Sequence, residues 1–169
     1  MDMNAHSHHS TLRERIVEHI FVGEALRELW CRGVFDVEVM RSEFDAYGYD
    51  LVMARGKIVR HIQFKTGTSR RPGDISVALA LAGKPSGCVI WIRVTNQLDM
   101  GPFFWFGAAA GEPVPPIKDY AIPLRATHNK DGERPERQNH RTIPSVEFRE
   151  IAKIDEVLNQ LFELPESAA

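Results

Sequence analysis

Gln63 and Lys65 lie two positions apart in the stretch IVRHIQFKTG, which covers residues 58–67. Side chains two apart on a β-strand point to the same face, so this spacing predicts an amide beside an ammonium group. Asp50 directly precedes the apolar stretch LVMA, and a tight turn near Gly56 separates the two stretches. Positions 50 and 63 are then equally distant from the turn. This predicts that Asp50 and Gln63 face each other across an antiparallel hairpin, about 5 Å apart.

An acid, an amide oxygen and a lysine on one patch suit the binding of a hard divalent cation, Mg²⁺ or Mn²⁺. Such a cation takes oxygen ligands and keeps several waters. We expect Asp50 to supply a carboxylate oxygen, Gln63 its side-chain oxygen and Phe64 its backbone carbonyl oxygen. Lys65 can then hold or help to deprotonate a metal-bound water, or neutralise charge that develops on a phosphate. The pattern therefore predicts metal-assisted phosphoryl chemistry.

Acidic residues outside the hairpin are candidates for completing such a site. Glu24 stands among apolar residues of a predicted helix, and we expect it to reach the same metal directly or through a water. Glu28, one turn further on, competes for that role. Glu43 and Asp45 precede Asp50 and are alternative second acids. An ordinary surface acid explains Glu24 equally well, and Glu43 and Asp45 are expected to be solvated in the loop before Asp50.

The surrounding elements follow from hydrophobic periodicity and turn residues. The first helix has Ser10 or Thr11 as a candidate N-cap, with Glu14 three residues after Thr11. Residues 108–145 are rich in Pro, Gly and charge and are predicted to be mostly loop, with room for one short strand. The predicted elements are a helix over 11–32, a strand around 36–39, two strands within 49–67, a helix over 75–82, strands over 88–94 and 103–107, and a helix over 154–164.

The order of these elements predicts an α/β fold with a central mixed β-sheet flanked by helices. The first three strands are expected to be antiparallel. The helix over 75–82 then leads from the hairpin to the apolar stretch CVIWIRV, which makes this strand parallel to its neighbour. We expect a single domain over residues 11–164, with flexible tails at 1–10 and 165–169.

The helix acid, the hairpin aspartate and the Gln-x-Lys sequence together resemble the PD-(D/E)xK nuclease superfamily. Glutamine in place of the acid before x-Lys is similar to Mrr-type restriction endonucleases. The stretches EHIFVGEALRELW, GYDLVMARGKIVRHIQFKTG and ALAGKPSGCVIWI also resemble a group of small uncharacterised bacterial proteins. The resemblance covers roughly residues 18–95 and implies a restriction-endonuclease-like core in the order αβββαβ.

This resemblance also implies roles for individual residues. Asp50 and Gln63 would bind the metal, Lys65 would be catalytic and Glu24 would assist. The chain departs from the usual pattern at Gln63, which brings no charge where an acid is common. That departure leaves open a catalytically inactive copy of the same fold.

Four further residues are candidates for contacts with nucleic acid. Arg70 and Arg71 follow the Lys65 strand, where a backbone phosphate would approach, although a solvated loop explains them equally well. His61 shares the predicted face of Gln63, with a packed sheet histidine as the alternative. Arg141 lies in RQNHRTIP, which is either a loop facing DNA or a structural bracket.

Net charge and cysteine usage limit the remaining possibilities. A formal net charge of -2 gives no global basic field, so nucleic-acid binding would need a local basic groove. The two cysteines are far apart and form neither a metal pair nor a disulfide framework, which favours a cytoplasmic protein. No apolar stretch reaches the length of a membrane span, so we expect no membrane association.

Together these features predict a metal-dependent endonuclease that hydrolyses phosphodiester bonds of nucleic acid, with DNA as the expected substrate and a homodimer as one possible state. The alternative is an inactive nucleic-acid-binding or protein-interaction module on the same fold. For the latter, FFWFGAAAG is the candidate apolar interface.

Overall fold

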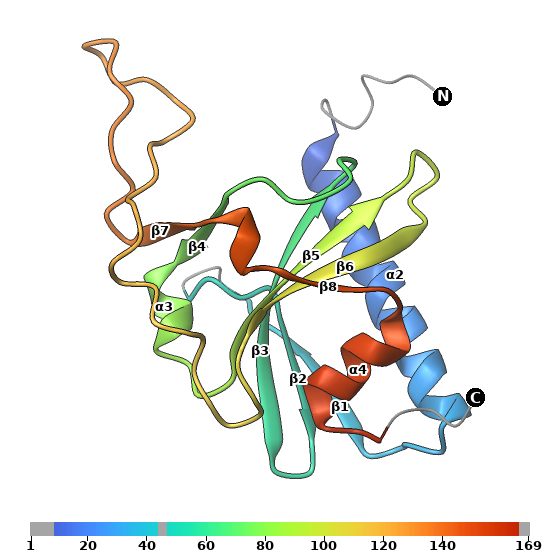
Figure 1. Ribbon diagram of the computed structural model, residues 1–169. Coiled ribbons are helices and arrows are strands. Elements are labelled where there is room, and N and C mark those ends of the chain that lie inside the picture. The colour runs from blue at the N-terminus through green and yellow to red at the C-terminus, as the bar shows by residue number, and fades with distance from the viewer. Residues whose placement is uncertain (1–8, 44–46, 166–169) are drawn as a thin grey trace.

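The structure is a computed structural model of the chain, and it describes residues 9–43 and 47–165 (Figure 1). The predicted tails therefore lie mostly outside the described residues, although the first helix already begins at Ser10. The elements in chain order are α2 (Ser10–Cys31), β1 (Val37–Arg41), β2 (Leu51–Arg55), β3 (Ile58–Gly67), β4 (Ile75–Ala78), α3 (Leu79–Ala82), β5 (Gly87–Val94), β6 (Met100–Gly107), β7 (His140–Ile143), a 3₁₀ turn (Ser145–Glu147), β8 (Arg149–Ile151) and α4 (Ile154–Phe162).

A six-stranded mixed sheet forms the centre of the molecule, in the order β1-β2-β3-β5-β6-β8. β3 and β5 run parallel, and every other neighbouring pair in this sheet is antiparallel. This confirms the predicted α/β class, the antiparallel meander and the parallel strand after the crossover. A separate two-stranded sheet pairs β4 with β7.

The β2–β3 hairpin has the predicted register. Leu51 pairs with Ile62 and Arg55 with Ile58, so position 50 falls opposite position 63. The two-residue turn between the strands has Gly56 at its first central position with a φ of 56°, a conformation that favours glycine. β2 has 5 residues whereas β3 has 10, so the second half of β3 extends beyond its partner.

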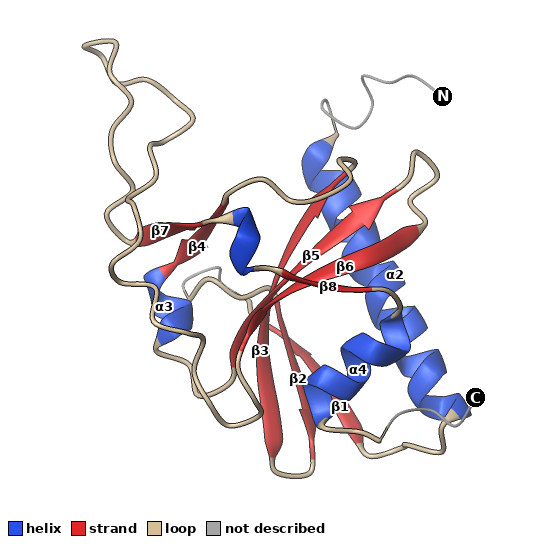
Figure 2. Cartoon of the chain, viewed as in Figure 1, coloured by secondary structure: helices blue, strands red, loops and turns tan. Residues whose placement is uncertain are grey.

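Helices α2 and α4 cover one face of the central sheet (Figure 2). α2 contributes Val17, Phe21, Ala25 and Leu29 to the core on this side. α4 buries the apolar residues that its periodicity predicts, which are Val157, Leu158, Leu161 and Phe162. Among the described residues, no helix is both long and apolar enough to cross a membrane.

The opposite face is covered by the β4–β7 ribbon, α3 and the segment after β6 (Figure 1). Its core includes Val77 and Leu81 from the crossover, together with Trp91 and Phe104 from the sheet. All four aromatic residues of the 103–106 stretch are buried, as expected of core residues. The candidate interface FFWFGAAAG is therefore largely internal at its aromatic end.

The predicted helix over 75–82 is wrong in its first half. Ile75–Ala78 forms β4, and only Leu79–Ala82 is helical. A short apolar run does not distinguish helix from strand by periodicity alone, and the β-branched residues Ile75 and Val77 favour the strand. The strand also has a partner that is distant in sequence, since Ile75 pairs with Ile143. This pairing accounts for the one short strand expected within 108–145.

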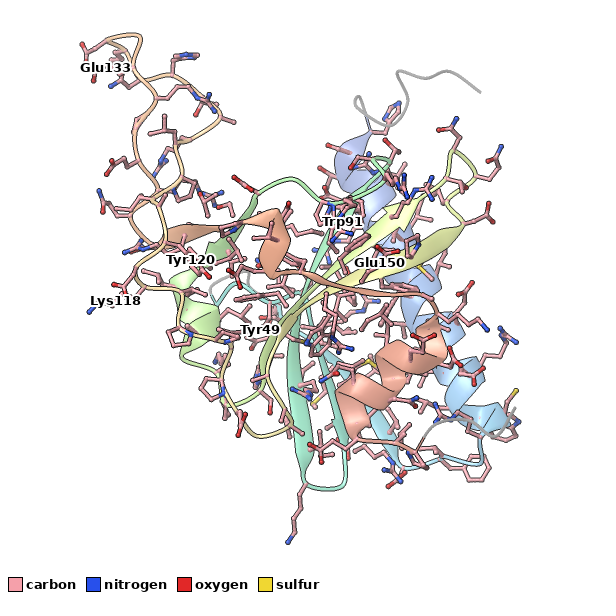
Figure 3. The ribbon with its side chains drawn as sticks, in the orientation of Figure 1. Tyr49, Trp91, Lys118, Tyr120, Glu133 and Glu150 are labelled. Carbon is pink, nitrogen blue, oxygen red and sulfur yellow. The ribbon has the colours of Figure 1, made fainter. Side chains whose placement is uncertain are left out.

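From the β6–β7 connection, residues 121–139 project away from the rest of the molecule, and we call this segment the arm (Figure 1). The arm has no helix or strand of its own, but an isolated bridge joins Leu124 to Glu136 across it. Glu133 lies near its tip, whereas Lys118 and Tyr120 lie beside its base (Figure 3).

Arg60 is fully buried on the helical face of the sheet. Its guanidinium donates to the carbonyl oxygens of Gln160 and Leu161, which belong to the last turn of α4, and to those of Ala108 and Ala109 after β6. Carbonyl groups at a helix C-terminus lack intrahelical partners and carry partial negative charge. Arg60 therefore ties the hairpin to α4 and provides donors for one buried and three partly buried carbonyl oxygens.

Replacing Arg60 by methionine should lower the free energy of unfolding by about 3 kcal/mol, because one buried and three partly buried carbonyl oxygens lose their donor. Urea denaturation followed by circular dichroism measures this change. Arg55→Met is the matched control in the same hairpin, since Arg55 forms only a partly exposed ion pair with Asp36. We expect that control to cost less than about 1 kcal/mol. Equal destabilisation by the two variants would contradict the structural role of Arg60.

Candidate functional site

The candidate site lies where β3 extends beyond the start of β2. Asp50 immediately precedes β2, and its backbone N–H donates to the carbonyl oxygen of Ile62 at 2.9 Å. Its carboxylate oxygen Oδ2 accepts a hydrogen bond from the backbone N–H of Phe64 at 2.7 Å. In a strand, the N–H and C=O groups of one residue point toward the same neighbour, so the Phe64 carbonyl also points to the side of Asp50. The Asp50 side chain thus accepts the next β3 hydrogen bond after the β2–β3 backbone pairing ends.

Gly48 holds the backbone before Asp50 against the β4–α3 junction. Its φ of 71° lies in the left-handed region, and a Cβ atom built on it would lie 2.4 Å from the Cβ of Ala78. A residue with a side chain is excluded at such a distance, so glycine permits the close approach. The position of Asp50 is therefore restrained on one side by Gly48 and on the other by the β3 ladder.

Gln63 and Lys65 share one face of β3, as strand alternation predicts. They pair in register with Val89 and Trp91 of β5, two residues of the core opposite the helices. Gln63 is only 8% exposed, and its Oε1 atom accepts no hydrogen bond from any described residue. A buried acceptor without a donor is rare and costly, so it calls for an unseen partner such as a water or an ion.

Two neighbouring hollows meet at Lys65, which lines both. The first, which we call the Asp50 hollow, has a volume of about 260 Å³; its lining includes Glu14, Glu18, Asp50, Phe64, Lys65 and Thr66. The second, the Gln63 hollow, has a volume of about 460 Å³; its lining includes Gln63, Lys65, Ser76, Arg137, Asn139 and His140. The structure thus brings Asp50 and Gln63 to opposite sides of Lys65 rather than into a single hollow.

The helix acids that line the Asp50 hollow are Glu14 and Glu18, whereas the sequence singled out Glu24. Glu24 lies further along α2 and does not line this hollow. The predicted capping role of Glu14 is not observed either. His9 is the N-cap residue of α2, and no side-chain hydrogen bond caps this helix end. Glu28 and Glu43 do not line this hollow either, and Asp45 lies outside the described residues.

Glu18 is 4% exposed and is neutralised by two arginines. It accepts a hydrogen bond from Arg15 at 3.0 Å and forms a close ion pair with Arg41 of β1. A buried carboxylate needs such partners, because its desolvation is otherwise very costly. In this arrangement Glu18 ties α2 to the edge of the sheet.

The oxygen atoms around Lys65 suit a hard cation better than a soft one. Asp50 and Phe64 line the Asp50 hollow and offer a carboxylate and a backbone carbonyl oxygen. The amide oxygen of Gln63 belongs to the neighbouring hollow and would reach the same cation through a coordinated water. Mg²⁺ and Mn²⁺ bind through few protein oxygens and retain waters. Within residues 9–43 and 47–165, no three His, Cys, Asp or Glu side chains cluster as a metal-binding group. The donor set therefore fits a weakly held, largely hydrated cation.

His61 packs beneath Tyr49, with the two ring centroids 4.9 Å apart. Burial, followed by the nearby charge of Lys84, lowers the pKa of His61 below its ordinary value, so the ring is neutral at pH 7. A neutral, half-buried ring favours the packing role over the predicted contact with a phosphate.

The three predicted arginines lie in different surroundings. Arg70 is exposed in the loop after β3. Arg71 forms an exposed ion pair with Glu150 at 3.2 Å and covers the ring of Phe104. Arg141 donates to the backbone carbonyl oxygens of Lys118, Gln138 and His140. These bonds favour the structural alternative, in which Arg141 links backbone segments at the base of the arm.

Arg137, Asn139 and His140 are the lining residues that sequence reasoning did not assign to the site. They reach Gln63 and Lys65 because β7 pairs with β4, which lies across the face of the central sheet. The polar run RQNH, whose last residue begins β7, was the available signal. Its place in the fold depends on a pairing between residues more than 60 positions apart, which is the separation of Ala78 from His140.

No protein-family model matches this chain, and no curated protein matches it in sequence. The chemistry of the site is therefore inferred from its residues and their geometry.

Asp50→Ala should expose the Phe64 amide to faster hydrogen exchange and lower the free energy of unfolding by about 1–2 kcal/mol, because this N–H loses its acceptor. Asp50→Asn keeps a side-chain oxygen at the same place and should retain most of the protection. Amide exchange of Phe64 measured by NMR separates the two variants. Unchanged exchange in Asp50→Ala would show that the carboxylate does not hold the end of β3.

Proposed function

We propose that the protein is a metal-dependent endonuclease with a restriction-endonuclease-like core, and that it hydrolyses phosphodiester bonds of nucleic acid, with DNA as the expected substrate. The observation that carries the proposal is the position of Lys65 on the wall shared by the Asp50 and Gln63 hollows. Lys65 forms no ion pair with any residue that the structure describes. Its charge is thus available to a phosphate group.

Each residue has a distinct role in the proposed reaction. Asp50 and the Phe64 carbonyl would hold a divalent cation in the Asp50 hollow, and Gln63 would reach it from the neighbouring hollow through a coordinated water. The cation would polarise the phosphate and lower the pKa of a coordinated water. The Phe64 amide fixes one oxygen of Asp50 and so orients the carboxylate. Lys65 compensates negative charge that builds up on the phosphate oxygens during displacement.

Local charge also supports the approach of a polyanion despite the negative net charge. The buried acid Glu18 is compensated by Arg15 and Arg41, so it adds little repulsion at the mouth of the Asp50 hollow. The Gln63 hollow contains Lys65 and Arg137, and none of the described residues lining it is an Asp or Glu. A phosphate at Lys65 would therefore meet uncompensated positive charge on one side and the proposed cation on the other.

One observation favours the alternative, a catalytically inactive module that binds nucleic acid. Gln63 replaces a common metal-binding acid, and Glu18 is engaged by arginines. The exposed Glu14, the other helix acid of the Asp50 hollow, lies 3.9 Å from an Arg13 nitrogen. A protein-interaction role has lost its main support, since Phe103, Phe104 and Phe106 are buried.

Lys65→Ala should reduce nucleic-acid cleavage at least about 100-fold, because the charge that compensates the phosphate is lost. Cleavage of supercoiled plasmid and of labelled oligonucleotides with Mg²⁺ or Mn²⁺ provides the measurement. Lys57→Ala removes the same charge at the exposed hairpin turn and should cut like the wild type. A wild-type protein that binds DNA but cuts neither DNA nor RNA would select the inactive module. Cutting by Lys65→Ala at the wild-type rate would refute the assignment of Lys65.

Gln63→Glu should strengthen the binding of Mn²⁺ about tenfold, because it adds a negative charge beside Asp50. Isothermal titration calorimetry in the absence of nucleic acid gives the affinity. Gln63→Leu is the companion variant: it removes the unpartnered oxygen, should weaken Mn²⁺ binding, and should leave thermal stability unchanged or higher. If both variants bind Mn²⁺ like the wild type, Gln63 is not part of a metal site.

A further inference from the structure

We propose that the base of the arm provides a second phosphate-binding position in the Gln63 hollow, in which Arg137 and Lys65 hold a phosphate next to the one that is cleaved. This inference rests on the proposed function, and it extends the site to the arm. The ligand is a phosphodiester group of a nucleic-acid strand.

The arm is held as a paired structure rather than as a loose loop. The Arg125 N–H donates to the carbonyl oxygen of Pro135 at 2.7 Å, one residue beyond the bridge between Leu124 and Glu136. The Arg137 N–H donates to the carbonyl oxygen of Pro123 at 2.8 Å. These bonds align the two sides of the arm from its base upward, and they fix the backbone of Arg137.

The base of the arm is also joined to the wall of the hollow. The Leu79 N–H, at the start of α3, donates to the carbonyl oxygen of Asn139 at 2.8 Å. His140 then begins β7 and pairs with Ala78 of β4. Asn139 and His140 thus have a fixed position relative to the sheet that carries Gln63 and Lys65.

The Arg137 side chain is oriented by His140. Its Nη2 atom lies 2.8 Å from Nε2 of the His140 ring. A guanidinium only donates hydrogen bonds, so this ring nitrogen must accept, and the ring must carry its proton on Nδ1. One edge of the guanidinium is occupied by His140, and the rest of its fork remains to bind a phosphate.

The composition of the hollow specifies an anion. Its lining contains two basic side chains, Lys65 and Arg137, and no acidic residue among the described ones. In contrast, the Asp50 hollow contains acids, and a further hollow along the arm contains Glu136. An arginine fork beside a lysine is the usual arrangement for binding phosphate oxygens.

Two polar atoms of the hollow have no hydrogen-bond partner among the described residues and are available to a ligand. Gln63 Oε1 and Ser76 Oγ are both buried, and neither forms a hydrogen bond with any described residue. Both residues line this hollow. The Ser76 hydroxyl can donate to a phosphate oxygen, while Gln63 can accept from a sugar hydroxyl, a base or a cation-bound water. A volume of about 460 Å³ lies in the range of small-ligand pockets, about 300–1,000 Å³.

The test measures binding without cleavage, in the presence of a chelator. Full-length protein is titrated into a fluorescein-labelled 20-base-pair duplex and into the corresponding single strand, at salt concentrations from about 50 to 200 mM. Arg137→Gln should weaken binding about tenfold at the lowest salt. It should also reduce the slope of log affinity against log salt by about one, because one phosphate contact is lost. The two probes show which form of the strand enters the hollow.

The matched control is Lys130→Gln, which removes one positive charge from the same arm at an exposed position that does not line the Gln63 hollow. Its salt slope should equal that of the wild type. Arg137→Lys keeps the charge but loses the fork, and should retain the slope with reduced affinity. Circular dichroism of each variant confirms that the fold is intact.

The outcomes separate this inference from the proposed function. Equal effects of Arg137→Gln and Lys130→Gln, or no binding of either probe by the wild type, would overturn the inference. If Arg137→Gln loses binding while the wild type cuts nothing with Mg²⁺ or Mn²⁺, the phosphate position is supported and hydrolysis is rejected. If the wild type cuts nucleic acid and Arg137→Gln binds and cuts equally well, the inference alone fails.

Discussion

The unequal lengths of β2 and β3 determine where polar chemistry can occur in this fold. β3 pairs with β5 from His61 to Gly67, but its pairing with β2 ends at Ile62. Beyond that point the backbone groups on one edge of β3 have no strand to bind, and backbone donors shielded from water need acceptors. The Asp50 carboxylate meets this need at Phe64. The same open edge brings Lys65 within reach of solvent, although it stands next to the apolar core.

Two buried polar residues of β3 illustrate the difference between support and function. Arg60 lies on the helical face, where four backbone carbonyl oxygens accept hydrogen bonds from it. Burial lowers the pKa of Arg60 from its ordinary value, and the dense set of acceptors compensates for the desolvation of its charge. Gln63 lies on the opposite face, three residues further on, and its Oε1 atom has no donor among the described residues. The hydrogen bonds of Arg60 give it a structural role, whereas the amide oxygen of Gln63 remains available to a water or a ligand.

The hairpin was predictable from sequence because its register depends only on local information. A tight turn and strict alternation place Asp50 opposite Gln63 without knowledge of the rest of the fold. The helix acid was not predictable in the same way. Which side of α2 faces the end of β3 depends on packing between distant elements, and that packing places Glu14 and Glu18 there rather than Glu24. Ile75–Ala78 forms a strand, and Arg137 approaches the site, because β4 pairs with β7. The chain between these two strands includes α3, β5, β6 and the whole arm.

The distribution of charge around Lys65 explains why a neutral residue at position 63 is compatible with a phosphate-binding site. Carboxylates occur on the Asp50 side of Lys65, and cations without acids occur on the Gln63 side. An acid at position 63 would strengthen a metal site but would also place negative charge in the hollow that contains Arg137. It would repel the phosphate that we propose to bind there. Glutamine keeps an oxygen donor at the boundary without that repulsion. On the proposed function, Gln63 would weaken the hold on a cation but keep acidic charge out of the hollow proposed for the nucleic-acid backbone. The balance between cutting and binding would then depend on how well Asp50 holds the metal.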